Sequence, residues 1–191
     1  MAWRATCAYR VLGLGEEELA ALLSEALQHS LSLLEACQGG DRELCDIFRE
    51  ALHGVLRPGH VGVAPALPLS DNGEPIEAFY AGSSTGQGGW IVFSPHILLE
   101  PLYAAHVLLH ELAHAVGLAD DDTAEALALY IEGVSGTPGE PGIVAEAAER
   151  LQRAGCAIHV EELRPLVPVK LTFFHTTDRS DPRAPHVTGE L

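Results

Sequence analysis

Two histidines and a glutamate near the middle of the chain have the types and spacing of a metal-dependent hydrolytic site. His110, Glu111 and His114 form the pattern HExxH. On a helix, residues four apart lie one turn along and about 40° round the axis, so the two histidines share a face and can reach one ion. Glu111 lies about 100° round from His110, where its carboxylate can take a proton from a water on that ion. The pattern therefore predicts a Zn²⁺ site with Glu111 as general base.

The residues after the second histidine supply candidates for a third ligand. Gly117 follows it by three positions and permits the left-handed turn that ends a helix, and Asp120 follows three positions later. The string HExxHxxGxxD would return Asp120 to the ion that the two histidines hold. Glu125, in a helix further on, is the alternative third ligand, although Asp122 and Glu125 also have the spacing of a helix-capping pair. Asp121 and Asp122 are further candidates.

The string HExxHxxGxxD resembles the zinc-binding signature of the metzincin clan of metallopeptidases, over about eleven residues. In that clan the last position is His or, in some members, Asp. The resemblance implies that both histidines and Asp120 bind zinc and that Glu111 is the general base. Metzincins also have a methionine turn below the metal, whereas the only Met of this chain is Met1. The segment from Glu125 is similar instead to the second metal helix of small gluzincins, which would make Glu125 the third ligand.

The segment that carries HExxH is almost entirely apolar and predicts a helix over residues 101–116. Pro101 suits its first turn and Gly117 its end. A helix of this composition is buried nearly all round, and unpaired polar groups inside it would each cost roughly 2–7 kcal/mol. A metal supplies the missing partners, so a surface helix with two solvated histidines fits poorly. His106, one turn upstream, is expected to be a packed, hydrogen-bonded core histidine in preference to a ligand or a support for one.

The other periodic segments predict a helix-rich α+β fold with a small mixed sheet around the metal-binding helix. Helices are expected at residues 16–37, 41–56, 122–132 and 143–154, with a short one after Ser94, and strands at 6–14, 60–64, 76–81, 90–93, 157–163 and 167–172. In zincins, the strand just before the metal helix often forms the rim of the cleft and pairs with an extended substrate. Residues 90–93 have this place in the chain, and an ordinary core strand is the alternative. Tyr130 is a candidate phenol for stabilising an oxyanion.

The length fits one domain, which we expect over residues 1–175 as a zincin-like unit. It would comprise an N-terminal helical hairpin at 1–57 and a catalytic core at 58–175. Residues 176–191 are polar and contain two prolines, so they predict a flexible tail.

The composition excludes several classes of partner. Asp and Glu number 27 against 11 Lys and Arg, for a net charge of −16, and such a surface repels the phosphates of nucleic acids. No apolar run approaches the ~20 residues of a membrane span, and the N-terminus lacks the pattern of a signal peptide. These features predict a cytoplasmic protein. The four cysteines form no CxxC pair; we expect free buried thiols, with a bridge between Cys37 and Cys45 as the alternative.

Together these features predict a zinc metallopeptidase, more specifically a metalloendopeptidase, that acts on a peptide or protein substrate. It could be broadly specific, or regulatory with a single cellular substrate. The alternative is a non-catalytic protein with a degenerate zincin fold, in which the metal is structural or the surface binds a partner.

Overall fold

The computed structural model describes residues 11–36, 42–56, 60–63, 73, 76–82, 89–133 and 142–153. In chain order the elements are α2 (Glu16–Ala36), α3 (Arg42–Leu56), β1 (Val61–Val63), β2 (Ala78–Ala81), β3 (Trp90–Phe93), the 3₁₀ helix η2 (Ile97–Leu99), α4 (Pro101–Ala115), α5 (Asp121–Gly133) and α6 (Gly142–Arg153). The expected helix-rich α+β fold with a small mixed sheet is confirmed. The strands expected at 157–163 and 167–172 and the tail at 176–191 lie outside the described residues. The strand expected at 6–14 is wrong for its described part, because residues 11 and 12 are helical.

The described sheet has the strand order β1-β3-β2. β1 is parallel to β3, with Val61 opposite Ile91, and β2 is antiparallel to β3, with Tyr80 opposite Ile91. β3 is therefore the middle strand, and both its edges are already paired. The expectation that residues 90–93 form a rim strand for substrate is wrong, because no edge of β3 is free to pair. In the described part of the sheet, β2 is an edge strand.

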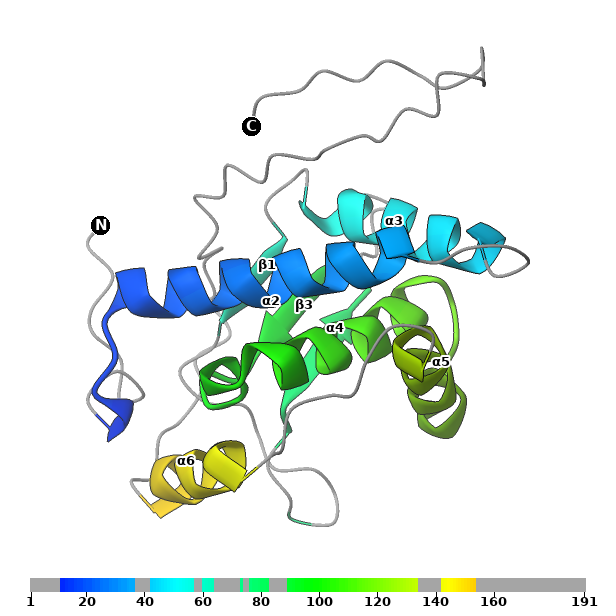
Figure 1. Ribbon diagram of the computed structural model, residues 1–191. Helices are drawn as coiled ribbons and strands as arrows, with labels where there is room; N and C mark the ends of the chain where they lie inside the picture. Colours follow the sequence, from blue (N-terminus) through cyan, green and yellow to red (C-terminus); the bar gives the residue numbers. More distant parts are fainter. Residues whose placement is uncertain are drawn as a thin grey trace.

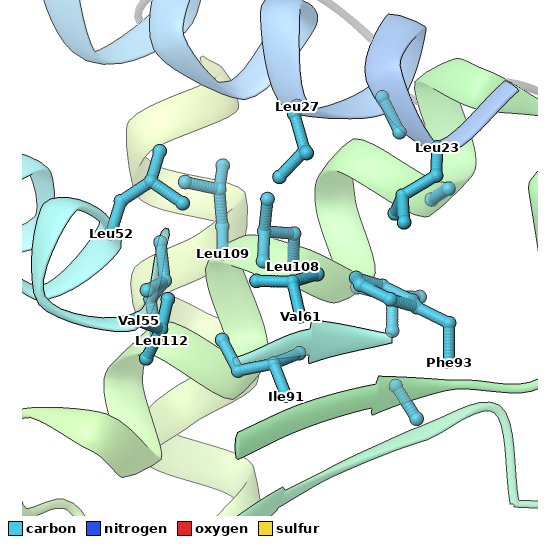
Figure 2. Packing of buried hydrophobic residues seen from close by; sticks show 14 of the residues in the cluster. Leu23, Leu27, Leu52, Val55, Val61, Ile91, Phe93, Leu108, Leu109 and Leu112 are labelled. Carbon is cyan, nitrogen blue, oxygen red and sulfur yellow. The ribbon is translucent and has the colours of Figure 1, made fainter. Parts of the chain in front are cut away.

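Helix α4, which carries HExxH, contacts α2, α3, α5 and β2. Figure 1 shows α2 and α4 side by side in front of the sheet, with α5 beside the C-terminal end of α4. Leucine, valine and aromatic side chains from these elements meet in one buried cluster (Figure 2). Burying each such side chain contributes roughly 1.5–3 kcal/mol. The labelled members are Leu23, Leu27, Leu52, Val55, Val61, Ile91, Phe93, Leu108, Leu109 and Leu112.

Both ends of α4 follow from local sequence. Pro101 occupies the first turn, where a missing backbone N–H costs no helical hydrogen bond. At the other end Gly117 has φ of +104°, a left-handed conformation that glycine adopts without a steric penalty. The N–H of Gly117 donates to His114 O at 3.0 Å, and the N–H of Leu118 donates to Ala113 O at 3.1 Å. This hydrogen-bond pair is the Schellman motif, and it turns the carbonyl of Leu118 back towards the helix.

Two local expectations need correction. Ser94 does not cap the short helix that follows it; its Oγ lies 2.6 Å from Nδ1 of His96, and that helix is the 3₁₀ helix η2. Cys45 is buried and disulfide-bonded, with its partner outside the described residues, so the expectation of a free thiol is wrong for Cys45. Among the described helices, none is both long enough and apolar enough to cross a membrane.

Candidate metal centre

Three side-chain atoms from α4 and α5 converge at the C-terminal end of α4. Nε2 of His110 lies 3.1 Å from Nε2 of His114, which lies 3.2 Å from Oδ1 of Asp121. Oδ1 of Asp121 is 4.0 Å from Nε2 of His110. Three ligands held at zinc–ligand distances in a tetrahedral arrangement would lie roughly 3.3 Å from one another. The spacing of the three atoms therefore fits a small divalent cation, and these residues could hold one.

Hydrogen bonds to the opposite nitrogens fix how the two imidazoles are presented. Nδ1 of His114 donates to Leu118 O at 2.7 Å, since a carbonyl oxygen only accepts. Nδ1 of His110 donates to Oε2 of Glu125 at 3.3 Å. The two Nε2 atoms then face each other as lone-pair acceptors, an arrangement that repels unless a cation or proton lies between them. Metal-binding histidines in proteins are oriented by partners of this kind.

Burial acts on the protonation of His110. Desolvation lowers the pKa of the ring below its ordinary value, although the hydrogen bond and the charge of Glu125 act in the opposite direction. The neutral imidazole, which is the form that binds metals, is therefore favoured.

The aspartate that meets the histidines is Asp121, and Asp120 serves α5 as its N-cap. Oδ2 of Asp120 accepts the backbone N–H of Thr123 at 2.8 Å and also the hydroxyl of Thr123. These two hydrogen bonds hold the pKa of Asp120 below its usual range. Because α5 begins at Asp121, its N-cap is Asp120 and not Asp122, the expected cap. The structure thus brings Asp121 to the histidines in place of Asp120, the third ligand expected first.

Glu111 lies in the interior beside the histidines and is 6% exposed. Burial raises the pKa of its carboxyl to about 7, against the opposing effects of His114 and of the backbone N–H of Tyr80, which donates to it. Oε2 of Glu111 has no hydrogen-bond partner among the described residues. A buried oxygen of this kind is costly unless it serves a purpose such as accepting a proton. The carboxylate thus accepts a hydrogen bond from Tyr80, while its Oε2 is buried without a partner among the described residues.

Two further acidic groups join the site through His106. Nδ1 of His106 lies 3.0 Å from Oε2 of buried Glu132, and its Nε2 lies 3.2 Å from Oε2 of Glu125. Burial acts to lower the pKa of His106, but the hydrogen bonds and charges of Glu132 and Glu125 outweigh it and raise the pKa. The expectation of a packed, hydrogen-bonded histidine is confirmed.

Sequence reasoning missed Glu132 as a partner of the site. A signal was present, because Asp121, Glu125 and Glu132 are spaced four and seven residues apart and therefore lie on one face of a helix. This acidic stripe on α5 meets the His106, His110 and His114 stripe of α4. Tyr130 lies about half a turn round from Asp121, on another face of α5, and is 48% exposed. The interpretation of Tyr130 as an oxyanion-stabilising phenol therefore has no support from its position.

A second pair links β2 to α4 on the same side. The hydroxyl of Tyr103 donates to Oε2 of Glu77 at 2.7 Å, just before β2 begins. Burial, the hydrogen bond to Glu77 and its charge all raise the pKa of Tyr103, so the phenol stays protonated and remains the donor. The contact ties the edge strand to the helix that carries the histidines.

Comparison of the chain with protein-family models, with curated proteins and with solved structures gives no match.

Proposed function

We propose that this protein is a zinc-dependent metallopeptidase of zincin type. The observation that carries the proposal is the approach of Nε2 of His110, Nε2 of His114 and Oδ1 of Asp121 to within 4.0 Å of one another, beside a buried Glu111. The described residues supply three ligands and leave a fourth position open, as in catalytic zinc sites, whereas structural sites are closed by four protein ligands. The open position favours catalysis over the alternative of a purely structural metal.

Zinc, when bound there, would polarise a peptide carbonyl and lower the pKa of a water towards about 7. The chain's own residues supply the proton transfers. Oε2 of Glu111, which has no partner among the described residues, is positioned to accept the proton of the attacking water. The pKa of about 7 suits a group that takes a proton and then returns it to the leaving amine. The backbone N–H of Tyr80 holds the carboxylate in place during both steps.

The edge of β2 offers a binding mode for the substrate. The N–H of Ser94 donates to Glu77 O, and the N–H of Ile91 donates away from β2, to His60 O. Tyr80, opposite Ile91, is therefore at a non-hydrogen-bonded position of the pair, and its N–H points outward to Glu111. An extended peptide laid along this outer edge would pass the general base, which supports a peptide or protein as substrate.

The test uses the purified chain with one equivalent of Zn²⁺ and a library of quenched fluorescent peptides. Glu111→Gln is expected to bind zinc normally and to lose roughly 10²–10⁴-fold in kcat/KM, the range that a general base contributes. Glu25→Gln, at an exposed carboxylate on α2, is the matched control and should cleave like the wild type. Cleavage by Glu111→Gln within a few fold of wild type would contradict the mechanism. A zinc-loaded wild type that cleaves no peptide would favour the non-catalytic alternative.

A further inference from the structure

Behind His110 lies a chain of polar contacts that begins at two buried residues, His106 and Glu132. His106 and Glu132 are only 7% and 4% exposed, and they lie 3.0 Å apart through Nδ1 and Oε2. Nε2 of His106 is 3.2 Å from Oε2 of Glu125, the same oxygen that lies 3.3 Å from Nδ1 of His110. The contacts therefore run from Glu132 through His106 and Glu125 and end on a candidate ligand.

Donor and acceptor rules fix the direction of these hydrogen bonds. An ionised carboxylate only accepts, so with Glu125 and Glu132 both ionised the two nitrogens of His106 donate and the ring carries a positive charge. That charge compensates Glu132 and Glu125 where an unpaired buried charge would be strongly unfavourable. One oxygen of Glu125 thus accepts from two imidazoles, which defines the position of its side chain.

We propose that Glu132 and His106 are positioning residues that hold Glu125 against Nδ1 of His110 and away from the metal position; this rests on the metal site of the proposed function. The Glu125 side chain is 46% exposed, so without this tie it is free to turn. A Glu125 that turns away no longer fixes the proton of His110 on Nδ1, and Nε2 is then no longer directed at the metal. Held in place, Glu125 instead keeps the proton of His110 on Nδ1 and directs Nε2 at the metal.

The first test measures Zn²⁺ affinity by competition with a chromophoric chelator. Glu132→Gln and His106→Gln are each expected to weaken binding roughly 10–100-fold, the usual cost of removing a partner of a ligand. The double variant should bind no more weakly than the weaker single variant, because both act through one chain of contacts. In the Co²⁺-substituted protein, both single variants should change the visible absorption spectrum, because the His110 ring is no longer held by Glu125 in its wild-type orientation.

Ser30→Ala is the matched control for general loosening of α4. The hydroxyl of Ser30 is buried in α2 and lies 3.3 Å from Ala105 O, next to His106 in the chain. Its loss disturbs the packing of α4 without touching the polar chain, so affinity and cobalt spectrum should match the wild type. An equal loss of affinity in Ser30→Ala would show that packing alone is responsible and would overturn the proposal.

A second measurement needs neither metal nor hydrolysis. Nitrogen-15 NMR of the metal-free wild type should show His110 protonated on Nδ1, and His106→Gln should shift the ring towards the Nε2-protonated tautomer. A wild type protonated on Nε2 overturns the proposal even if the variants fail to fold. Affinities within twofold of wild type, with an unchanged cobalt spectrum, also overturn it. If affinity falls as expected and no peptide is cleaved, the positioning role stands and the proposed peptidase activity does not.

Discussion

The Nδ1 atom of His114 donates to the carbonyl oxygen of Leu118, at 2.7 Å, across the turn that ends α4. That turn exists because Gly117 adopts φ of +104°. Gly117, which has no side chain, thus determines how the candidate ligand His114 is oriented.

Gly117→Ala is expected to lower the free energy of unfolding by about 1–2 kcal/mol, since a side chain disfavours the left-handed conformation. A Cβ at this position meets nothing within 4 Å, so the effect is conformational and not a clash. Because Leu118 O would move from His114, Zn²⁺ affinity should also fall, by roughly tenfold or more. Urea unfolding and chelator competition measure the two effects.

Gly54→Ala, in the last turn of α3, is the control for Gly117→Ala and a prediction in its own right. Its Cβ also meets nothing within 4 Å, but its backbone is helical. Alanine should therefore raise the free energy of unfolding by about 0.5–1 kcal/mol and leave metal affinity unchanged. A destabilised Gly54→Ala or a fully stable Gly117→Ala would contradict the conformational argument.

Neighbouring aspartates should respond differently to replacement. Asp121→Ala is expected to weaken Zn²⁺ binding by more than about 100-fold, because removing a ligand costs more than removing a partner of one. Asp120→Ala should retain the affinity and lower the melting temperature, since it removes the cap of α5. Isothermal titration and thermal unfolding of the metal-free proteins separate the two. Should Glu125→Ala abolish binding while Asp121→Ala retains it, Glu125 is the third ligand, as in the gluzincin resemblance.

Because His96 is buried, the free energy of unfolding should fall in mild acid. Burial lowers its pKa to about 4, whereas the ordinary value in an unfolded chain is about 6.5. Between these values the unfolded chain takes up a proton that the folded chain does not, so stability is lost as the pH falls from about 6.5 towards 4. The loss amounts to roughly 3 kcal/mol.

Urea unfolding at several pH values tests this assignment. His96→Gln should show a shallower decline than the wild type, whereas His29→Gln, at a 41% exposed side chain of α2, should decline as the wild type does. Equal slopes for His96→Gln and wild type would assign the acid sensitivity to other groups.

The charge distribution predicts which peptides are cleaved fastest. Residues 58–149, which include the candidate site, contain thirteen Asp and Glu and no Lys or Arg. One sign of charge around a site attracts substrates of the other sign and raises their association rate roughly tenfold or more at low salt. Peptides with flanking lysines should therefore have a higher kcat/KM than the same peptides with flanking glutamates. The difference should shrink near 1 M salt, and an unchanged ratio would mean that long-range charge plays no part.

The residues that begin and end helices and strands explain which parts of the fold could be predicted. Pro101 and Gly117 bound the helix that carries HExxH, and α4 ends within one residue of the expected position. The three described strands were also recognisable from short apolar runs between turn signals. Their order was not, because the place of β3 between β1 and β2 depends on pairings between distant segments.

The residue types of the candidate site could be predicted, but not which of the neighbouring aspartates meets the histidines. Three consecutive aspartates follow Gly117, and a shift of one residue in the start of α5 exchanges cap and ligand between Asp120 and Asp121. The role of Glu132 depends on how α5 lies against α4, which spacing along one helix does not determine. The disulfide of Cys45 likewise depends on a distance between segments.

The candidate ligands come from two helices, with His110 and His114 on α4 and Asp121 at the first residue of α5. An ion bound by both helices would hold the start of α5 against α4. When a chelator removes the ion, the backbone amides of α5 should therefore be the first to exchange their hydrogens. An opened α5 would expose the buried face of α4 to proteolytic cleavage. The lifetime of the protein in a cell would then follow the supply of the metal.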